Sequence, residues 1–427
     1  MSFYEPIVKS NFTVNVNIPG SKSITNRALI LSALSGRETT LKNILLSDDT
    51  IYMIEALKKL GNKIELSENN TSLFIKGNKN PTFNNIDIFV GNAGTAMRFL
   101  SSYLATGNGV AILRGNDRMN QRPIKDLVDS LLQLGVEVEY LNNSGYPPIK
   151  LTCSGVQSQY VQIDGSKSSQ YISSILMACA NFKNNIEVFL QGKVVSKPYI
   201  NMTLNMMKSF GIKCNVANNT FYLSPQNFGT KEYIIEGDMS SASYFLAMAL
   251  ISNSTVTLNN FFKNSIQGDS KFLDVLLKMG LTIVSQNEHS ITVKGCSSYN
   301  GVTLSMNDIP DVAQTLASVA LFATSPTIVN DVENMRIKET DRISALKNEI
   351  TKIGGEFIEY QDGFKIIPKD EKEYTGTSLE TYDDHRMAMS LSLIGLRVPG
   401  IKILDPNCVS KTFPNYFEEF SKIYKED

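Results

Sequence analysis

The sequence predicts an α/β protein of at least two domains, assembled from six copies of one repeated unit. A polar cluster rich in Gly, Ser and Asp precedes a helix of small apolar residues at six places along the chain. Amphipathic helices that end at Gly lead into segments of alternating apolar residues, the pattern of half-buried strands. The length of 427 residues exceeds the usual size of one domain. Self-similarity at a near-constant spacing indicates a repeat architecture.

The six polar clusters mark six helix starts. They begin at Gly20, Gly91, Gly165, Gly237, Asn307 and Asp383. The first N–H groups of a helix have no partner within the helix, and the helix dipole is positive at this end. Anions can therefore bind there, and the repeat multiplies such places.

The helix–glycine–strand segments recur in step with the polar clusters. A Gly just after an amphipathic helix fits a C-cap, because it adopts the left-handed conformation at little cost. The five glycines are Gly61, Gly135, Gly211, Gly280 and Gly354. A sixth helix, from Pro414, is followed by almost no chain. We expect the alternating segment Phe12 to Ile18 to supply its missing strand, which would place both termini in one domain.

The first cluster combines flexible backbone with positive charge. Gly20, Ser21 and Ser23 supply turn and capping residues, and Lys22 and Arg27 add two cations. This combination predicts a phosphate or carboxylate site, although the spacing is not that of a Walker A loop. An ordinary capped helix with solvated cations is the alternative interpretation.

The second and third clusters carry no decisive signal by themselves. Two glycines, Gly91 and Gly94, indicate either close approach of backbone to a ligand or tight packing. Residues 165–170 offer hydroxyls and an amide at a helix start, which fit a phosphate dianion or a Ser-rich N-cap equally well.

The last three clusters carry acidic residues. Asp238 is predicted to be structural, as a cap or an ion-pair partner. Asp311 is either an N-cap or, if it faces a substrate hydroxyl, a general base. Residues 383–386 combine acid, imidazole and guanidinium beside apolar residues. Such groups are costly to bury unless paired, which favours a functional role.

Cations recur at helix starts along the whole chain. These are Lys22, Arg27, Arg122, Lys338, Arg342, Arg386 and Lys411. A solvated charged face is the usual reason for such a run. If all seven face one cleft, they would suit a pair of substrates with two phosphates and a carboxylate.

Composition excludes several classes of protein. The net charge of −1 gives no reason to expect a nucleic-acid or membrane partner. The first residues lack a signal-peptide pattern, and no apolar run reaches the roughly 20 residues of a membrane span. Five scattered Cys indicate reduced thiols in the cytoplasm, and only two His exclude a multi-His metal site.

The motifs together resemble those of the 5-enolpyruvylshikimate-3-phosphate synthase family. They include PGSKSITNRA, GNAGTAMR, RPIKDLV, DGSKSSQY, EGDMSSASY, RIKETDRI and DDHRMAMSLSL, in the family's order from Pro19 to Phe417. The resemblance implies a two-domain inside-out α/β barrel of six βαβαββ repeats, three per domain. One discontinuous domain, 1–20 plus 240–427, would carry both termini. The continuous domain would be 21–239, with the active site in the cleft between them.

The resemblance implies a transferase of the shikimate pathway. It would move the enolpyruvyl group of phosphoenolpyruvate to the 5-hydroxyl of shikimate 3-phosphate and release phosphate. This addition–elimination needs proton transfer and charge stabilisation, with no metal or organic cofactor. A cytoplasmic monomer with these small-molecule substrates as its partners is the family expectation.

The resemblance also implies site residues. Asp311 would accept the proton of the 5-hydroxyl, Glu339 would protonate the methylene carbon, and Lys22 would share acid or base duty. His385 would orient its neighbours. Shikimate 3-phosphate would be bound by Lys22, Ser23, Arg27, Ser168, Ser169, Gln170, Ser196, Tyr199, Asp311, Asn334 and Lys338. Phosphoenolpyruvate would be bound by Lys22, Asn92, Gly94, Arg122, Gln170, Arg342, Arg386 and Lys411.

Three positions depart from the family's common pattern. Phe99 stands where Pro is common, Met335 where Trp is common, and Asp308 where His is common. None removes a proposed catalytic group. Gly94 and Ala96 resemble the type of enzyme that glyphosate inhibits, so we expect inhibition.

Two other functions fit parts of the pattern. The enzyme that transfers enolpyruvyl to UDP-N-acetylglucosamine shares the repeat but typically uses a loop Cys, and residues 107–123 contain none. A non-catalytic repeat protein that binds anions at its helix starts would need neither Asp311 nor Glu339.

Overall fold

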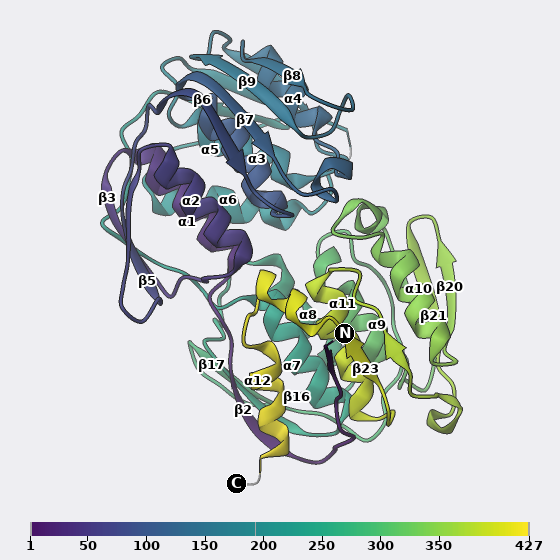
Figure 1. Cartoon of the computed structure of the whole chain (residues 1–427). Helices are drawn as coiled ribbons and strands as arrows, with labels where there is room; N and C mark the ends of the chain where they lie inside the picture. Colours follow the sequence, from purple (N-terminus) through teal and green to yellow (C-terminus); the bar gives the residue numbers. More distant parts are fainter. Residues whose placement is uncertain (1, 193, 426–427) are drawn as a thin grey trace. The chain divides into compact units, whose positions relative to one another are not determined.

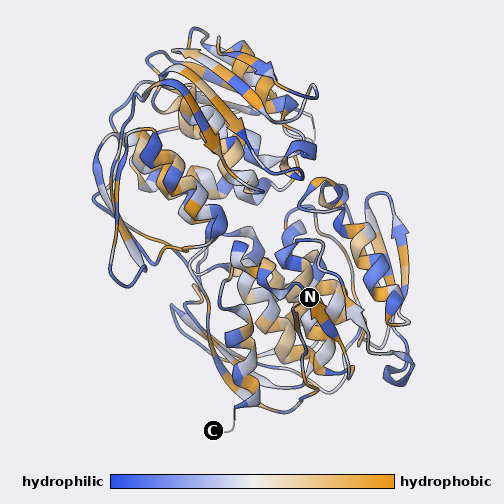
Figure 2. Ribbon diagram, in the orientation of Figure 1, coloured by the Kyte–Doolittle hydropathy of each residue, from blue (hydrophilic) through white to orange (hydrophobic). Residues whose placement is uncertain are grey.

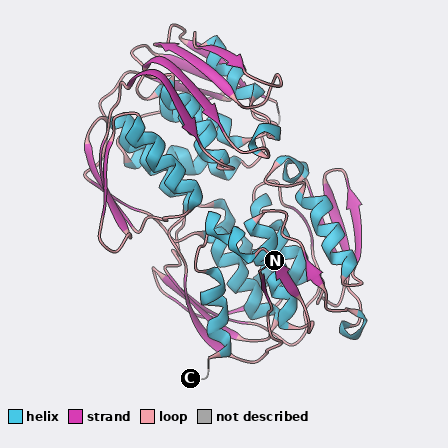
Figure 3. Cartoon of the chain, in the orientation of Figure 1, coloured by secondary structure: helices cyan, strands magenta, loops and turns pink. Residues whose placement is uncertain are grey.

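The computed structural model describes residues 2–192 and 194–425 (Figure 1). The chain divides into two compact units. Unit 1 combines Met1–Pro19 with Glu236–Asp427, and unit 2 is Gly20–Ile235. Helices and short strands alternate through both units, which makes the protein an α/β protein with several small mixed sheets (Figure 3).

Unit 2 contains three four-stranded sheets with one strand order. In each sheet the first two strands are parallel, and every later neighbour is antiparallel. The sheets are β14 (Glu232–Ile234), β3 (Glu38–Lys42), β5 (Ser72–Lys76), β4 (Lys63–Leu66); β6 (Thr82–Phe89), β7 (Asn108–Arg114), β9 (Ile149–Ser154), β8 (Glu137–Tyr140); and β10 (Tyr160–Asp164), β11 (Ile186–Gln191), β13 (Thr220–Leu223), β12 (Asn215–Ala217).

Two kinds of helix accompany these sheets. The first kind is buried on nearly all sides and consists of α1 (Lys22–Ser35), α3 (Gly94–Leu104) and α5 (Ser169–Cys179), which contact one another. The second kind is amphipathic and consists of α2 (Asp48–Lys59), α4 (Lys125–Gln133) and α6 (Lys197–Ser209). A helix that is apolar all round belongs in a core, and an amphipathic one covers it.

Unit 1 repeats the same strand order in two of its three sheets. These are β16 (Thr282–Gln286), β17 (Ser290–Lys294), β15 (Thr255–Asn259), β2 (Thr13–Asn17), and β18 (Thr303–Ser305), β19 (Thr327–Asn330), β21 (Gly363–Ile367), β20 (Glu356–Tyr360). The third sheet has three strands, β1 (Phe3–Tyr4), β23 (Lys402–Leu404) and β22 (Ser378–Leu379). None of the sheets closes into a ring within the described residues.

The helices of unit 1 again form a buried set and a covering set. The buried set is α7 (Met239–Ile251), α9 (Ala313–Ala320) and α11 (His385–Ser392). The covering set is α8 (Phe272–Met279), α10 (Arg342–Lys352) and α12 (Tyr416–Ser421). Short 3₁₀ segments contain three of the predicted site residues: Asp311 in η3 (Pro310–Val312), Asn334 in η4 (Glu333–Ile337) and Lys411 in η7 (Pro406–Lys411). Hydrophobic and hydrophilic residues mix along the covering helices (Figure 2).

The predicted capping residues occupy the predicted roles. All five glycines after the amphipathic helices have positive φ, from 82° at Gly211 to 117° at Gly280. Ser21 and Ser168 are N-caps whose side chains accept backbone N–H bonds, and Asp384, for which no capping role was predicted, caps α11 in the same way. Asp238 is a structural cap, because its side chain accepts from the N–H of Ser241.

The prediction that Phe12 to Ile18 supplies the strand missing after the last helix is wrong. Thr13–Asn17 pairs in parallel with Thr255–Asn259 over five residues. The strand that joins the last sheet is instead Phe3–Tyr4, which pairs with β23. The three residues of β23 cannot match a five-residue strand, whereas β15 matches all of it and buries alternate side chains on both strands.

No helix in the described part of the chain has the length and apolar character needed to cross a membrane.

Candidate active site

Unit 1 gathers charged residues at the starts of three helices. Asp311 lies in η3, directly before α9. Arg342 is the first residue of α10, whose N-cap Asp341 accepts the N–H of Ser344. Arg386 is in the first turn of α11, capped by Asp384. Capping residues fix where each helix begins, so they also fix where these side chains project.

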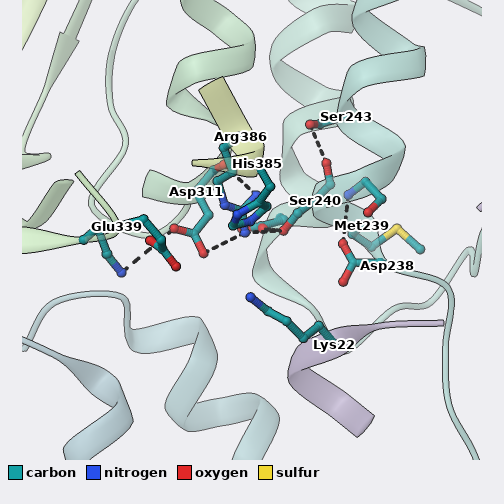
Figure 4. Close-up of polar contacts among 12 residues, drawn as sticks. Lys22, Asp238, Met239, Ser240, Ser243, Asp311, Glu339, His385 and Arg386 are labelled. Carbon is teal, nitrogen blue, oxygen red and sulfur yellow. Dashed lines mark hydrogen bonds and ion pairs between the residues drawn. The ribbon is translucent and has the colours of Figure 1, made fainter. Parts of the chain in front are cut away.

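Asp311 is the meeting point of three cations. Its carboxylate lies 3.0 Å from Nη2 of Arg386, 3.2 Å from Nη1 of Arg342 and 3.9 Å from Nζ of Lys338. Arg386 also donates to the backbone carbonyl of Asp311 at 3.0 Å. Figure 4 shows the Asp311 carboxylate directed at Arg386.

These cations determine the ionisation of Asp311. Burial alone would raise the pKa of its carboxyl group, but Arg386, Lys338 and Arg342 outweigh burial and bring the pKa below its usual range. Asp311 is therefore ionised at neutral pH.

Glu339 lies in the same network. Its carboxylate is 2.8 Å from Nη2 of Arg342 and 3.6 Å from Nζ of Lys411, and the residue is 8% exposed. Burial would lower the pKa of Arg342, but Asp384, Glu339 and Asp311 raise it. The arginine is thus a fixed positive charge among three carboxylates.

Ser240 and Asp269 extend the network on the α7 side. Arg386 donates to the hydroxyl of Ser240 at 3.4 Å, and Ser240 donates to Asp269 (Figure 4 shows Ser240). Burial, then the charge of Asp311, raises the pKa of Asp269 to about 6. His385 lies beside Asp384, with Nδ1 3.7 Å from Oδ1.

Unit 2 holds most of the remaining predicted residues. Lys22, in the first turn of α1, forms an ion pair with Asp49 at 3.0 Å. Arg122 donates to both the carbonyl and the side-chain oxygen of Asn92, each at 3.0 Å. A Cβ added to Gly94 would lie 2.6 Å from Nη2 of Arg122, so this glycine leaves room for the guanidinium.

Gln170 joins the Arg122 cluster through the helix start of α3. Its amide nitrogen lies 3.5 Å from the hydroxyl of Thr95, the neighbour of Gly94. Ser168 caps α5 by accepting the N–H of Gln170, and Ser169 is buried beside it. The starts of α3 and α5 therefore bring together residues that are 75 positions apart.

Arg27 is more enclosed than the sequence suggests. It is 2% exposed and donates to Thr203, Ser173 and the carbonyls of Ser23 and Tyr199. Burial lowers its pKa to about 10, so it stays charged at neutral pH. The guanidinium nitrogens of Arg27 thus donate hydrogen bonds to other groups of the protein.

Ser196, Asn334 and Lys411 lie at element boundaries. Ser196 is the buried residue before α6 and has a φ of 52°. Asn334 is buried within η4, and Lys411 ends η7.

The three departures from the family pattern have ordinary structural places. Phe99 is buried on α3, with the guanidinium of Arg27 5.2 Å from its ring centre. Met335 is buried in η4. Asp308 pairs with Lys271 at 3.5 Å on the surface.

Sequence reasoning missed the partners of the predicted residues. Asp49, Asp384, Ser240 and Thr95 each contact a predicted site residue, and Asp269 accepts a hydrogen bond from Ser240. Asp384 and Ser240 both stand inside the motifs, and the need of a buried Arg for a counter-ion points to Asp384. Nothing local in the sequence marks Asp49 or Asp269 as a partner.

Taken one unit at a time, the arrangement suits anion chemistry. Unit 1 offers an ionised carboxylate between two arginines, with a second buried carboxylate beside a lysine. Unit 2 offers a lysine, an arginine and hydroxyls at helix starts. Within residues 2–192 and 194–425 no group of three His, Cys, Asp or Glu side chains is arranged to bind a metal ion.

Comparison with known proteins gives one family throughout. The family model for EPSP synthase (3-phosphoshikimate 1-carboxyvinyltransferase) matches residues 8–420. A 3-phosphoshikimate 1-carboxyvinyltransferase of Erwinia tasmaniensis is 44% identical over 415 residues, covering 96% of this chain and 95% of the relative. The enzyme of that name from Mannheimia haemolytica is 45% identical over 421 residues, covering 96% of each chain.

The fold is also that of a solved structure. EPSP synthase from Acinetobacter baumannii superposes with a TM-score of 0.81 at 24% identity, over 99% of this chain and 98% of the other.

Proposed function

The chain belongs to the EPSP synthase family, and from this premise we propose how its residues divide the family's reaction. The protein is a transferase of the shikimate pathway, which leads to the aromatic amino acids. It moves the enolpyruvyl group of phosphoenolpyruvate to shikimate 3-phosphate. The observation that carries the proposal is the array in which Arg342 connects Asp311, Glu339 and Asp384.

Asp311 and Glu339 are proposed to move the protons. In the addition, the 5-hydroxyl oxygen bonds to C2 of phosphoenolpyruvate, Asp311 accepts the hydroxyl proton, and Glu339 protonates C3. In the elimination, C3 returns a proton to the Glu339 carboxylate, phosphate leaves C2 with the proton held by Asp311, and the double bond is restored. Lys22 is proposed to assist as an acid or base.

The depressed pKa of Asp311 has a consequence for this role. A carboxylate held between cations is ionised but is a weak base. When the carboxylate of phosphoenolpyruvate pairs with Arg342 and Arg386, less positive charge acts on Asp311. Its pKa then rises toward the range in which it accepts a proton.

Phosphoenolpyruvate is proposed to bind to cations of both units. Arg342 and Arg386 suit its carboxylate, because planar guanidinium groups match carboxylate geometry. The other proposed contacts are Lys22, Asn92, Gly94, Arg122, Gln170 and Lys411.

Shikimate 3-phosphate is proposed to bind chiefly at the starts of α1, α5 and α6. Ser168 and Ser169 would bind its phosphate together with Lys338, and Asp311 would meet the 5-hydroxyl. The other proposed contacts are Lys22, Ser23, Arg27, Gln170, Ser196, Tyr199 and Asn334.

The finer architecture is part of the proposal. The shared strand order of five sheets supports six βαβαββ repeats, three per unit, in an inside-out barrel. In this scheme β14 and β2 each complete a sheet whose other strands lie elsewhere in the chain. We also propose a cytoplasmic monomer. Lys22→Ala in unit 2 and Arg386→Gln in unit 1 should both raise the KM of phosphoenolpyruvate.

Glu339→Gln tests the catalytic proposal against a protein that only binds anions. We expect turnover to fall by about 10²–10⁴-fold, measured as phosphate release, with shikimate 3-phosphate affinity kept within about threefold by calorimetry. Glu356→Gln, an exposed carboxylate on β20, is the matched control. Turnover of the Glu339 variant within about twofold of the parent enzyme would contradict the proposed role.

A further inference from the structure

The turn that leads into α11 is strained. Tyr382 and Asp383 have φ values of 56° and 52°, the left-handed region that side chains other than glycine's rarely adopt. The turn is closed by the N–H of Asp384, which donates to the carbonyl of Thr381 at 2.9 Å. Consecutive residues persist in this conformation only where their surroundings fix it.

A buried carboxylate outside the active site contacts this turn. Glu349, on α10, is 0% exposed. It accepts the hydroxyl of Tyr382 at 2.6 Å and the backbone N–H of Glu380 at 2.9 Å. Its remaining described partner is Lys352, at 2.9 Å. A fully buried charge is costly without such partners, and two of its contacts are made to one turn.

The hydroxyl of Tyr382 is a hydrogen-bond donor at neutral pH. Burial and then the Glu349 carboxylate raise the pKa of Tyr382 to about 12, so the phenol keeps its proton at neutral pH. A hydrogen bond from a hydroxyl to a carboxylate is of the stronger, charge-assisted kind.

Helix α10 thus contacts the turn at two places. Its first residue, Arg342, binds the side chain of Asp384 at 2.7 Å. Glu349, two helical turns further along α10, binds the other end of the turn. Asp384 in turn accepts the N–H of Arg386 at 2.9 Å and begins α11. The place of the Arg386 side chain therefore depends on the turn.

We propose that Glu349 is a positioning residue for the transferase reaction: it fixes the turn 380–384 and, through it, the direction in which Arg386 meets phosphoenolpyruvate. This inference rests on the proposed function of Arg386 as a ligand of the phosphoenolpyruvate carboxylate. Glu349 itself touches neither substrate.

Glu349→Gln and Tyr382→Phe separate positioning from support of the fold. The Gln amide offers one acceptor oxygen, so it cannot accept both from Tyr382 and from Glu380 with its two ends. We expect the KM of phosphoenolpyruvate to rise about tenfold in each variant, the effect of one lost charge-assisted hydrogen bond. The KM of shikimate 3-phosphate should stay within about twofold. The double variant should be little worse than either single one, because both remove the same contact.

Lys352→Met is the matched control, since it removes the 38% exposed cation that pairs with Glu349 and, at 3.6 Å, with the Glu380 side chain, and leaves both hydrogen bonds of Glu349 to the turn. It should keep both KM values. If Glu349→Gln does not fold, Tyr382→Phe alone decides, because it removes one oxygen atom.

A lower melting temperature with both KM values unchanged would overturn the proposal and leave Glu349 as a structural residue. Arg386→Gln tests the premise that Arg386 binds the phosphoenolpyruvate carboxylate. If this variant keeps the KM of phosphoenolpyruvate, the proposed function of Arg386 is wrong, and the inference about Glu349 falls with it.

Discussion

Arg342 and Asp384 form an ion pair that is closed off from solvent. Nε of Arg342 is 2.7 Å from one carboxylate oxygen of Asp384, and Nη2 is 3.3 Å from the other. The two side chains are 1% and 0% exposed. Because Arg342 begins α10 and Asp384 caps α11, this pair joins the starts of two helices that carry residues of the candidate site.

Asp384→Asn should destabilise unit 1. The substitution leaves the buried guanidinium of Arg342 with one fewer negative partner, and breaking a buried pair typically costs about 3–5 kcal/mol. Glu339 and Asp311 still contact Arg342, so we expect the lower end, about 3 kcal/mol. Urea unfolding followed by circular dichroism measures this. A loss below about 1 kcal/mol would show that the pair contributes little to stability.

Asp269→Asn should stabilise the protein above pH 6. Burial and then Asp311 raise the pKa of Asp269 to about 6, so the native state binds more protons than the unfolded chain between about pH 4 and 6. Stability from this group is present below about pH 4 and is lost as pH rises to 6.

The Asp269→Asn variant does not lose this stability, because an amide does not ionise. At pH 7 the variant should therefore melt at a higher temperature than the parent, with a gain of about 1–3 kcal/mol in the free energy of unfolding. The difference should shrink toward pH 4. A difference that is the same at both pH values would contradict the raised pKa of Asp269.

Gly94→Ala should weaken phosphoenolpyruvate binding. The added methyl group would lie 2.6 Å from Nη2 of Arg122, so the guanidinium must move. We expect the KM of phosphoenolpyruvate to rise by about tenfold and inhibition by glyphosate to weaken. Steady-state kinetics with and without glyphosate check both. Unchanged inhibition would refute the place of Gly94 beside the phosphoenolpyruvate site.

The local features of the fold were predictable from the sequence because each depends on a few neighbouring residues. A Gly after an amphipathic helix and a Ser or Asp before an apolar one decide where a helix ends or begins, and Gly280, Ser168 and Asp384 occupy those places. The repeat also places cationic residues at helix starts, and Arg342 and Arg386 lie at the starts of α10 and α11.

Pairing over long distances was not predictable in the same way. The alternation at Thr13–Asn17 indicates a strand but says nothing of its partner, and β15 follows more than 230 positions later. The same holds for Asp49, which meets Lys22 from another helix. The sequence around Arg27 suggests an exposed cation. Its burial depends on Ser173 and Thr203, which accept its hydrogen bonds and lie far from it along the chain.

Phosphate release from phosphoenolpyruvate tests the central claim most directly. The purified protein is mixed with phosphoenolpyruvate and either shikimate 3-phosphate or UDP-N-acetylglucosamine, and free phosphate is measured over time. We predict release with shikimate 3-phosphate alone, and loss of that release in Glu339→Gln. Release with UDP-N-acetylglucosamine alone, or no release with either acceptor from a folded sample, would contradict the account.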